Sequence, residues 1–155
     1  MTTIAMAPHD EITISGLITS NESEFKYNNC VYKGEHRDGM ADGEGTLTYP
    51  DGEYKGQWRT NNRHGHGVLT MRTGGSYTGE WLDDYKHGWG VEVYSNRVKI
   101  RHLGDGIMAY EQVDFGSYEG QFHMGVRHGE GTITYQGKTY PCRWKHGTMV
   151  PNDDK

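Results

Sequence analysis

The stretch Tyr54-Lys55-Gly56-Gln57-Trp58, which His64-Gly65-His66-Gly67 follows six residues later, decides the fold of this chain. Related stretches begin at Tyr32, Tyr77, Tyr118 and Tyr140. Successive tyrosines lie 22, 23, 41 and 22 residues apart, and a Gly-x-Gly pair stands eleven residues after each of the first four. Self-similarity at a period of about 20–50 residues indicates a repeat architecture.

The 41-residue interval is about two periods long, which predicts a degenerate unit inside it. Residues 104–110 (Gly-Asp-Gly-Ile-Met-Ala-Tyr) align with residues 43–49 (Gly-Glu-Gly-Thr-Leu-Thr-Tyr), but no Tyr or Trp precedes them at the usual positions. We therefore expect about five units over 24–147, one of them degenerate at 98–117. Because a repeat array is stabilised by units and their neighbours, the degenerate unit should be its weakest part.

Each unit is predicted to form two β-strands joined by turns. Tyr54, Gly56 and Trp58 share one face of the first strand, whereas Lys55 and Gln57 share the other, and this period of two indicates a strand. No stretch shows helical periodicity over ten or more residues. The sequence thus predicts an all-β fold, an elongated single-layer antiparallel β-meander of hairpins. Glycines opposite aromatic residues leave flat backbone for the rings and let the sheet curve into a trough.

Composition agrees with a thin structure. Only 33% of the 155 residues are apolar, but 23 glycines and regularly placed aromatic residues argue against disorder. The net charge of −5 disfavours binding to nucleic acid, which requires clustered Lys and Arg. We expect a cytoplasmic protein, because no secretory signal is visible. Residues 1–23 are predicted to be partly irregular or packed on the sheet, and 148–155 to be a flexible tail.

The repeated pattern Tyr-x-Gly-x-Trp followed by His-Gly-x-Gly resembles the MORN (membrane occupation and recognition nexus) family. The resemblance runs from Tyr32 to about Gly147. His36 replaces the first Trp, and Pro141 and Cys142 depart from the pattern in the last unit, which predicts a terminal capping strand there. Chains of this family typically serve as rigid interaction platforms, so the resemblance implies a scaffold.

The aromatic face of the trough is the main candidate site. The residues predicted to contact a partner are Tyr54, Trp58, Tyr77, Trp81, Glu92, Tyr118 and Phe122. Glu92 breaks the pattern, since Leu47, Leu69 and Ile133 occupy its place in other units. Two states are open for its carboxylate: it reaches solvent, or it awaits a Lys or Arg of a partner.

Two further surfaces stand out. The opposite face is apolar where other units carry polar residues, at Val68, Trp89, Val91, Val93 and Ile107. It is either a dimer or partner surface, or it is covered by the apolar residues of 1–23. Arg97, Lys99 and Arg101 form a basic cluster, which is either a solvated edge or a site for an anionic lipid headgroup.

The sequence predicts no catalytic residues, no metal site and no cofactor. His64, His87 and His128 recur at one position of the repeat, so we interpret them as structural. No nucleophile elbow and no phosphate-binding glycine loop is present. The chain is therefore predicted not to be an enzyme.

The leading functional prediction is a scaffold that binds a partner helix or extended segment in its aromatic trough. Its expected setting is a cytoskeletal, ciliary or membrane-associated assembly, with cytoskeletal or motor proteins among the partners. The alternative is an adaptor that binds phosphoinositides or anionic membranes, and another is an accessory unit for an enzyme on a separate chain. A homodimer and a weak contact with anionic lipid are further interactions that the sequence allows.

Overall fold

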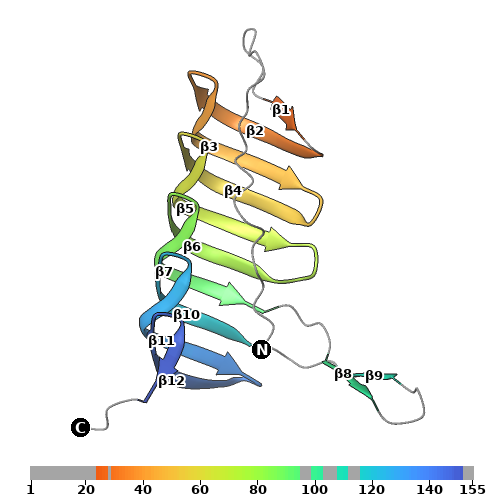
Figure 1. Cartoon of the computed structure of the whole chain (residues 1–155), viewed down its shortest axis with the longest axis vertical. Coiled ribbons are helices and arrows are strands. Elements are labelled where there is room, and N and C mark those ends of the chain that lie inside the picture. The colour runs from red at the N-terminus through yellow and green to blue at the C-terminus, as the bar shows by residue number, and fades with distance from the viewer. Residues whose placement is uncertain (1–23, 28, 95–98, 103–107, 112–115, 152–155) are drawn as a thin grey trace.

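The computed structural model describes residues 24–27, 29–94, 99–102, 108–111 and 116–151. These form thirteen strands and no helix (Figure 1). The strands are β1 (Glu24–Tyr27), β2 (Cys30–Arg37), β3 (Met40–Tyr49), β4 (Gly52–Arg59), β5 (Asn62–Met71), β6 (Ser76–Leu82), β7 (Tyr85–Val93), β8 (Lys99–His102), β9 (Met108–Glu111), β10 (Ser117–His123), β11 (Val126–Tyr135), β12 (Lys138–Lys145) and β13 (Thr148–Val150).

Eleven of these strands form one open antiparallel sheet in the order β1-β2-β3-β4-β5-β6-β7-β10-β11-β12-β13. Figure 1 shows them stacked along the long axis, with hairpin turns at alternate sides. Along this order each strand is followed by the next strand of the chain, except at β7, which is followed by β10. The predicted all-β meander in a single layer is therefore confirmed.

A row of glycines crosses this sheet and sets its register. Gly56 faces Gly45 on one side and Gly67 on the other, and the same facing pairs continue in both directions. The row comprises Gly34, Gly45, Gly56, Gly67, Gly79, Gly90, Gly120 and Gly131, and it ends opposite Cys142. Since a one-residue slip would turn the aromatic residues to the other face, this row fixes which face is buried.

The glycine row exists because tyrosine rings lie on it. A Cβ atom at Gly67 would stand 2.2 Å from the hydroxyl oxygen of Tyr54, so only glycine leaves room for the ring. The Tyr54 hydroxyl donates a hydrogen bond to the carbonyl oxygen of Gln57, 3.0 Å away. The equivalent tyrosines of the other three complete units make the same bond. In each complete unit, the tyrosine side chain is thus hydrogen-bonded to the backbone of its own unit.

A β-bulge in each unit bends the long strands. Gly65 has φ +61°, which favours glycine, and the N–H of the next residue, His66, donates to Oε1 of Gln57 at 2.9 Å. Glu35, Glu80 and Gln121 accept the corresponding N–H groups in the other units. The pairing register shifts at these places, as between Gly56 and Trp58, and such bulges add twist and redirect a strand.

The two-residue turn between the two strands of a unit is hydrogen-bonded to the preceding unit. Both residues of the turn Thr60-Asn61 have positive φ, as type I′ hairpins require. The Asn61 N–H donates to the carbonyl oxygen of Ala41 at 2.9 Å, and its Oδ1 accepts the Ala41 N–H at 2.8 Å. Backbone N–H groups of later turns reach the preceding unit in the same way, from Asp84 to Arg63, from Gly125 to Lys86 and from Gly147 to Arg127.

The predicted degenerate unit at 98–117 is not part of the array. β7 pairs directly with β10, so that Gly90 faces Gly120 and the glycine row continues without a break. β8 and β9 pair only with each other, as a separate two-stranded sheet. The segment lacks the Tyr-x-Gly half of the repeat. It therefore has no tyrosine ring that could pack on the glycine row.

The connection between Tyr94 and Gly116 is an enlarged hairpin turn. The Tyr94 N–H donates to the Gly116 carbonyl at 3.2 Å, as the Met71 N–H donates to the Gly75 carbonyl at 2.8 Å. Three residues, 72–74, separate Met71 from Gly75, whereas 21 residues, 95–115, separate Tyr94 from Gly116. The inserted residues therefore replace a turn and not a unit.

The ends of the array differ in part from the prediction. β1 pairs with β2, and Tyr27 faces Cys30. At the other end, β12 is followed by β13, whose residues 148–150 pair with 143–145. These three residues thus belong to the sheet and not to a flexible tail, and β12 is not terminal. Residues 1–23 and 152–155 lie outside the described residues.

Candidate binding surface

The rings of the trough form one unbroken row from β2 to β12. Tyr54 contacts Trp58 of its own unit and Trp81 of the next edge-on, with centroids 5.1 and 5.3 Å apart. The same geometry joins Tyr32 to Trp58, Tyr77 to Trp81, Tyr77 to Phe122, Tyr118 to Phe122 and Tyr118 to Trp144. Such pairs contribute about 0.5–1.5 kcal/mol each beyond the area they bury, so this aromatic row ties the units together.

The structure brings the predicted aromatic contacts together and also buries them. Tyr54, Trp58, Tyr77, Trp81, Tyr118 and Phe122 are between 0 and 6% exposed. They form the core of the protein with Leu47 and Leu69, which fill the places between successive tyrosines. A partner in the trough would therefore meet the side chains that cover the rings, and few of the ring atoms themselves.

Cationic side chains provide much of that cover. The Arg63 guanidinium lies 4.3 Å from the ring centroid of Trp81, and the Lys86 ammonium lies 4.9 Å from that of Tyr77. The Arg127 guanidinium stands 4.7 Å from the Tyr118 ring. Cations over aromatic faces are attracted by the ring quadrupole. We call Arg63, Lys86 and Arg127 the cation row.

Each member of the cation row occupies the same place in its unit, nine residues after the tyrosine. Arg63, Lys86 and Arg127 lie on β5, β7 and β11, which are two strands apart in the sheet. Since neighbouring strands are about 4.8 Å apart, the charges follow one another at roughly 10 Å. The regular spacing was visible in the sequence, but only the register shows that these residues cover the rings.

Glu92 is paired within the chain. Its carboxylate contacts the Lys86 ammonium at 2.5 Å and the Arg127 guanidinium at 2.6 Å. Burial by itself raises the pKa of Glu92, but the two neighbouring cations outweigh it and hold the pKa below its ordinary value. Neither predicted state, solvent contact or a basic residue of a partner, describes this carboxylate, because its counter-ions come from the cation row.

Arg63 is also fixed by an acidic neighbour. Its Nε donates to Oδ1 of Asp84 at 2.9 Å, and its Nη2 donates to the Asp84 carbonyl oxygen at 3.1 Å. Asp84 belongs to the turn of the following unit, so this pair crosses a unit boundary. The side chain of Arg63 is 16% exposed, so the group still reaches the trough surface.

The opposite face carries exposed apolar side chains in the centre of the array. Val68, Trp89 and Val93 are 39, 47 and 40% exposed, and Val91 is partly exposed. The predicted apolar patch is therefore present at these positions. Ile107 and residues 1–23 lie outside the described residues, so whether the patch binds a partner or is covered by the N-terminal segment stays a prediction.

The predicted basic cluster falls in the inserted segment. Lys99 and Arg101 lie in β8. Arg97 lies outside the described residues. Among the described strands, β8 pairs with β9 and belongs to a different sheet from the eleven-stranded one.

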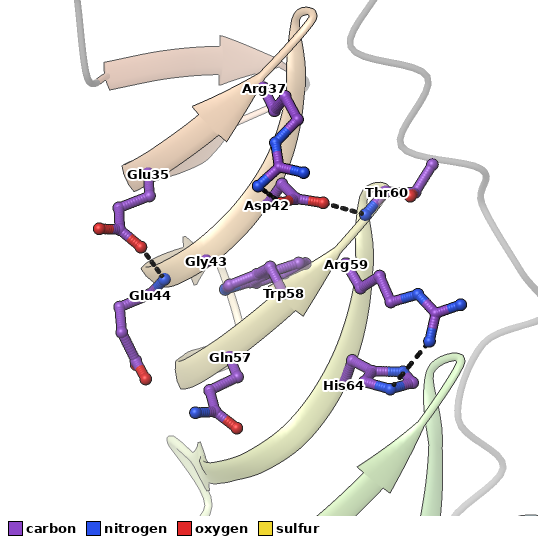
Figure 2. A pocket seen from close by; sticks show the side chains of 10 residues that line it. All are labelled: Glu35, Arg37, Asp42, Gly43, Glu44, Gln57, Trp58, Arg59, Thr60 and His64. Carbon is purple, nitrogen blue, oxygen red and sulfur yellow. Dashed lines mark hydrogen bonds and ion pairs between the residues drawn. The ribbon is translucent and has the colours of Figure 1, made fainter.

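A polar surface pocket lies between the first two complete units (Figure 2). The residues that line it are Glu35, Arg37, Asp42, Gly43, Glu44, Gln57, Trp58, Arg59, Thr60 and His64. Asp42 joins the two units, since it contacts Arg37 at 3.2 Å and accepts the Thr60 N–H at 3.4 Å. Arg59 lies 3.4 Å from Nε2 of His64 in the same region. These polar side chains contact one another, and the contacts of Asp42 connect the two units.

Metal coordination finds no support in the described ranges. No three His, Cys, Asp or Glu side chains there are arranged to hold a metal ion. His64, His87 and His128 do recur at one position of successive units, where each strand leaves the turn. The same part of the chain contains no helix long and apolar enough to cross a membrane.

The sequence profile of the MORN repeat matches four stretches of this chain, at 32–53, 54–76, 77–98 and 118–139. Together they cover more than half of its length. The chain belongs to the MORN repeat family. The first three stretches are consecutive, and 99–117 is left out, as the pairing of β7 with β10 requires. No curated protein matches the sequence.

MORN repeats point to a role in protein interaction or at membranes, and the family is generally non-catalytic. In this chain, the repeats place an aromatic row beneath a layer of charged and partly buried side chains. The strand register accounts for both features, because rings and cations alternate across neighbouring strands on one face.

Proposed function

We propose that this MORN protein is a non-enzymatic scaffold for protein–protein interaction, which holds a helix or extended segment of a partner in its trough. The setting we propose is a cytoplasmic assembly of the cytoskeleton or cilium, or one associated with a membrane. A cytoskeletal or motor protein is the partner class that such a setting suggests.

One observation carries this proposal. The aromatic row from Tyr32 to Trp144 makes a stiff, extended body, in which the same side-chain positions return every second strand. A rigid surface loses little conformational freedom when it binds, so more of the contact energy appears as affinity. The partly buried Met71, Tyr94 and Ile133 pack at the edge of the core and supply apolar contact area along the trough.

A pair of adjacent residues on opposite faces tests the proposal. Met71→Glu places a charge on the trough, whereas Thr70→Glu places the same charge on the opposite, exposed face of β5. Both variants should keep the native far-ultraviolet circular dichroism. Affinity purification with mass spectrometry should recover a set of proteins with wild type and Thr70→Glu that is lost with Met71→Glu.

Two outcomes would contradict the trough as the site. One is a folded Met71→Glu variant that recovers every protein as wild type does. The other is a loss of partners in Thr70→Glu alone, which would move the interaction to the opposite face.

Binding to phosphoinositides or other anionic lipids is the second candidate function. The observation in its favour is that Lys99 and Arg101 fall within the four residues of β8. Sedimentation with vesicles that contain phosphatidylinositol bisphosphate should then depend on salt, and Lys99→Glu/Arg101→Glu should abolish it. Equal sedimentation with neutral phosphatidylcholine vesicles would contradict this function.

A further inference from the structure

Four imidazole rings stand side by side across the C-terminal half of the sheet. His87 lies in β7, His123 at the end of β10, His128 in β11 and His146 in the turn after β12. The centroids of successive rings are 5.2, 5.7 and 5.0 Å apart. Because β7, β10, β11 and β12 are neighbours in the sheet, the rings form a continuous histidine row.

The surroundings of two rings in the histidine row favour the neutral imidazole. Nδ1 of His128 accepts the backbone N–H of His146 at 3.3 Å. Nδ1 of His87, at the same position of its unit, is buried and has no hydrogen-bond partner. A protonated imidazole has two donors and no acceptor. Protonation would therefore remove the first bond and leave a buried unpaired N–H at the second position.

The charged groups around the histidine row do not supply counter-ions. Those on the strands and turns that carry or flank it are Glu80, Asp83, Asp84, Lys86, Glu92, Glu119, Arg127, Glu130, Lys138, Arg143 and Lys145. Glu92 pairs with Lys86 and Arg127. Glu80 accepts the Trp89 N–H, Asp83 stands beside His64, Asp84 pairs with Arg63 and Glu130 pairs with Arg143. Among the described residues, no carboxylate forms an ion pair with any of the four rings, and Lys86, Arg127 and Lys145 are their immediate chain neighbours.

The N-terminal half of the array differs. The position of His87 and His128 is held by Asp42 in the first complete unit and by His64 in the second. Nδ1 of His64 is likewise buried without a hydrogen-bond partner, but it lies 3.4 Å from Oδ1 of Asp83, so a proton on His64 gains a nearby carboxylate. Protonation thus has opposite consequences in the two halves of one sheet.

We propose that the histidine row is a pH-sensitive joint, which loosens strands β10 to β12 on acidification while strands β3 to β5 stay paired. Imidazole is the side chain that changes charge between about pH 5 and pH 8. Each proton taken up in the row adds a positive charge beside another ring. Protonation of His128 removes its hydrogen bond with His146, and protonation of His87 buries an unpaired N–H. The inference concerns the free protein and stands apart from the proposed function.

Amide hydrogen exchange of the full chain, read by mass spectrometry, tests this inference. Protection factors are compared at about pH 7.5 and pH 5.5 after correction for the intrinsic exchange rate. Between these values, protection of 117–145 should fall at least about tenfold more than protection of 40–71. An equal change in the two segments would overturn the proposal.

Variants separate the histidine row from a general effect of acid. His123→Gln interrupts the row, and the carbonyl oxygen of Asn in His128→Asn can still accept the His146 N–H. The double variant should lose most of the acid-specific fall in protection. His66→Gln, at an exposed position of β5 outside the row, is the matched control and should retain that fall. An unchanged fall in a folded double variant would refute the mechanism.

A second measurement needs no variant. Salt screens like charges, so about 0.5 M sodium chloride should restore part of the protection of 117–145 in the wild-type chain at the acidic pH. No recovery in salt would also overturn the proposal, whether or not the double variant folds.

Discussion

Gly67→Ala tests the central feature of this fold, the fit of tyrosine rings on bare backbone. A Cβ at position 67 would lie 2.2 Å from the hydroxyl oxygen of Tyr54 and 2.4 Å from its Cζ. The ring is 0% exposed and is held between Trp58 and Trp81. Elsewhere in a strand, alanine is more favourable than glycine by about 0.5–1 kcal/mol. We therefore expect Gly67→Ala to destabilise the protein.

The magnitude follows from two ways of relieving the clash. If the ring moves out, the protein loses its hydrogen bond to Gln57, about 1 kcal/mol, and two edge-on contacts of about 0.5–1.5 kcal/mol each. If the backbone moves instead, overpacking costs about 1–3 kcal/mol. The less costly route decides the outcome. After the gain from alanine of about 0.5–1 kcal/mol, we expect the free energy of unfolding to fall by about 1 kcal/mol.

The assay is urea-induced unfolding, followed by circular dichroism, in three backgrounds. In Tyr54→Phe the Cζ atom remains, so Gly67→Ala should still destabilise. In Tyr54→Ala the ring is gone, and Gly67→Ala should be neutral or stabilise by up to about 1 kcal/mol. If Gly67→Ala stabilises the wild-type chain, or costs the same without the ring, then ring packing does not explain the glycine row.

Three further predictions rest on other parts of the structure. Replacing 95–115 by the three-residue connection of the β5–β6 hairpin should leave the strand content of the circular dichroism spectrum intact, because β7 pairs with β10 directly; loss of cooperative unfolding would contradict this. Glu92→Gln should cost about 3 kcal/mol at neutral pH, since it leaves Lys86 and Arg127 without their carboxylate. Because the folded pKa of Glu92 is lowered from 4.5, the difference in urea unfolding should close as acid protonates the wild-type carboxyl, and a constant difference would be inconsistent. Burial raises the pKa of Tyr118 to about 12, so the fold favours its neutral phenol, and stability should fall as pH rises from about 10; an absorbance titration should show this ionisation together with unfolding, and ionisation near pH 10 in a folded chain would contradict it.

The repeat itself determined the strands, the turns and the face that is buried. Alternation around Tyr54 and Trp58 specifies a strand with a single aromatic side, and glycines at a fixed offset specify where the rings lie. These are short-range relations, because a hairpin brings residues about eleven positions apart into register. For the same reason the family could be inferred from the motif alone.

The tertiary structure decided which of these repeats share one sheet and which charges meet. Residues 104–110 resemble a strand of the array, but the glycine row closes from Gly90 to Gly120 and leaves them out. Glu92 looked unpaired because Arg127 is 35 residues away in sequence, although it reaches the same carboxylate as Lys86. Contacts across an insertion depend on how the whole sheet is stacked, and a local pattern contains no information about that stacking.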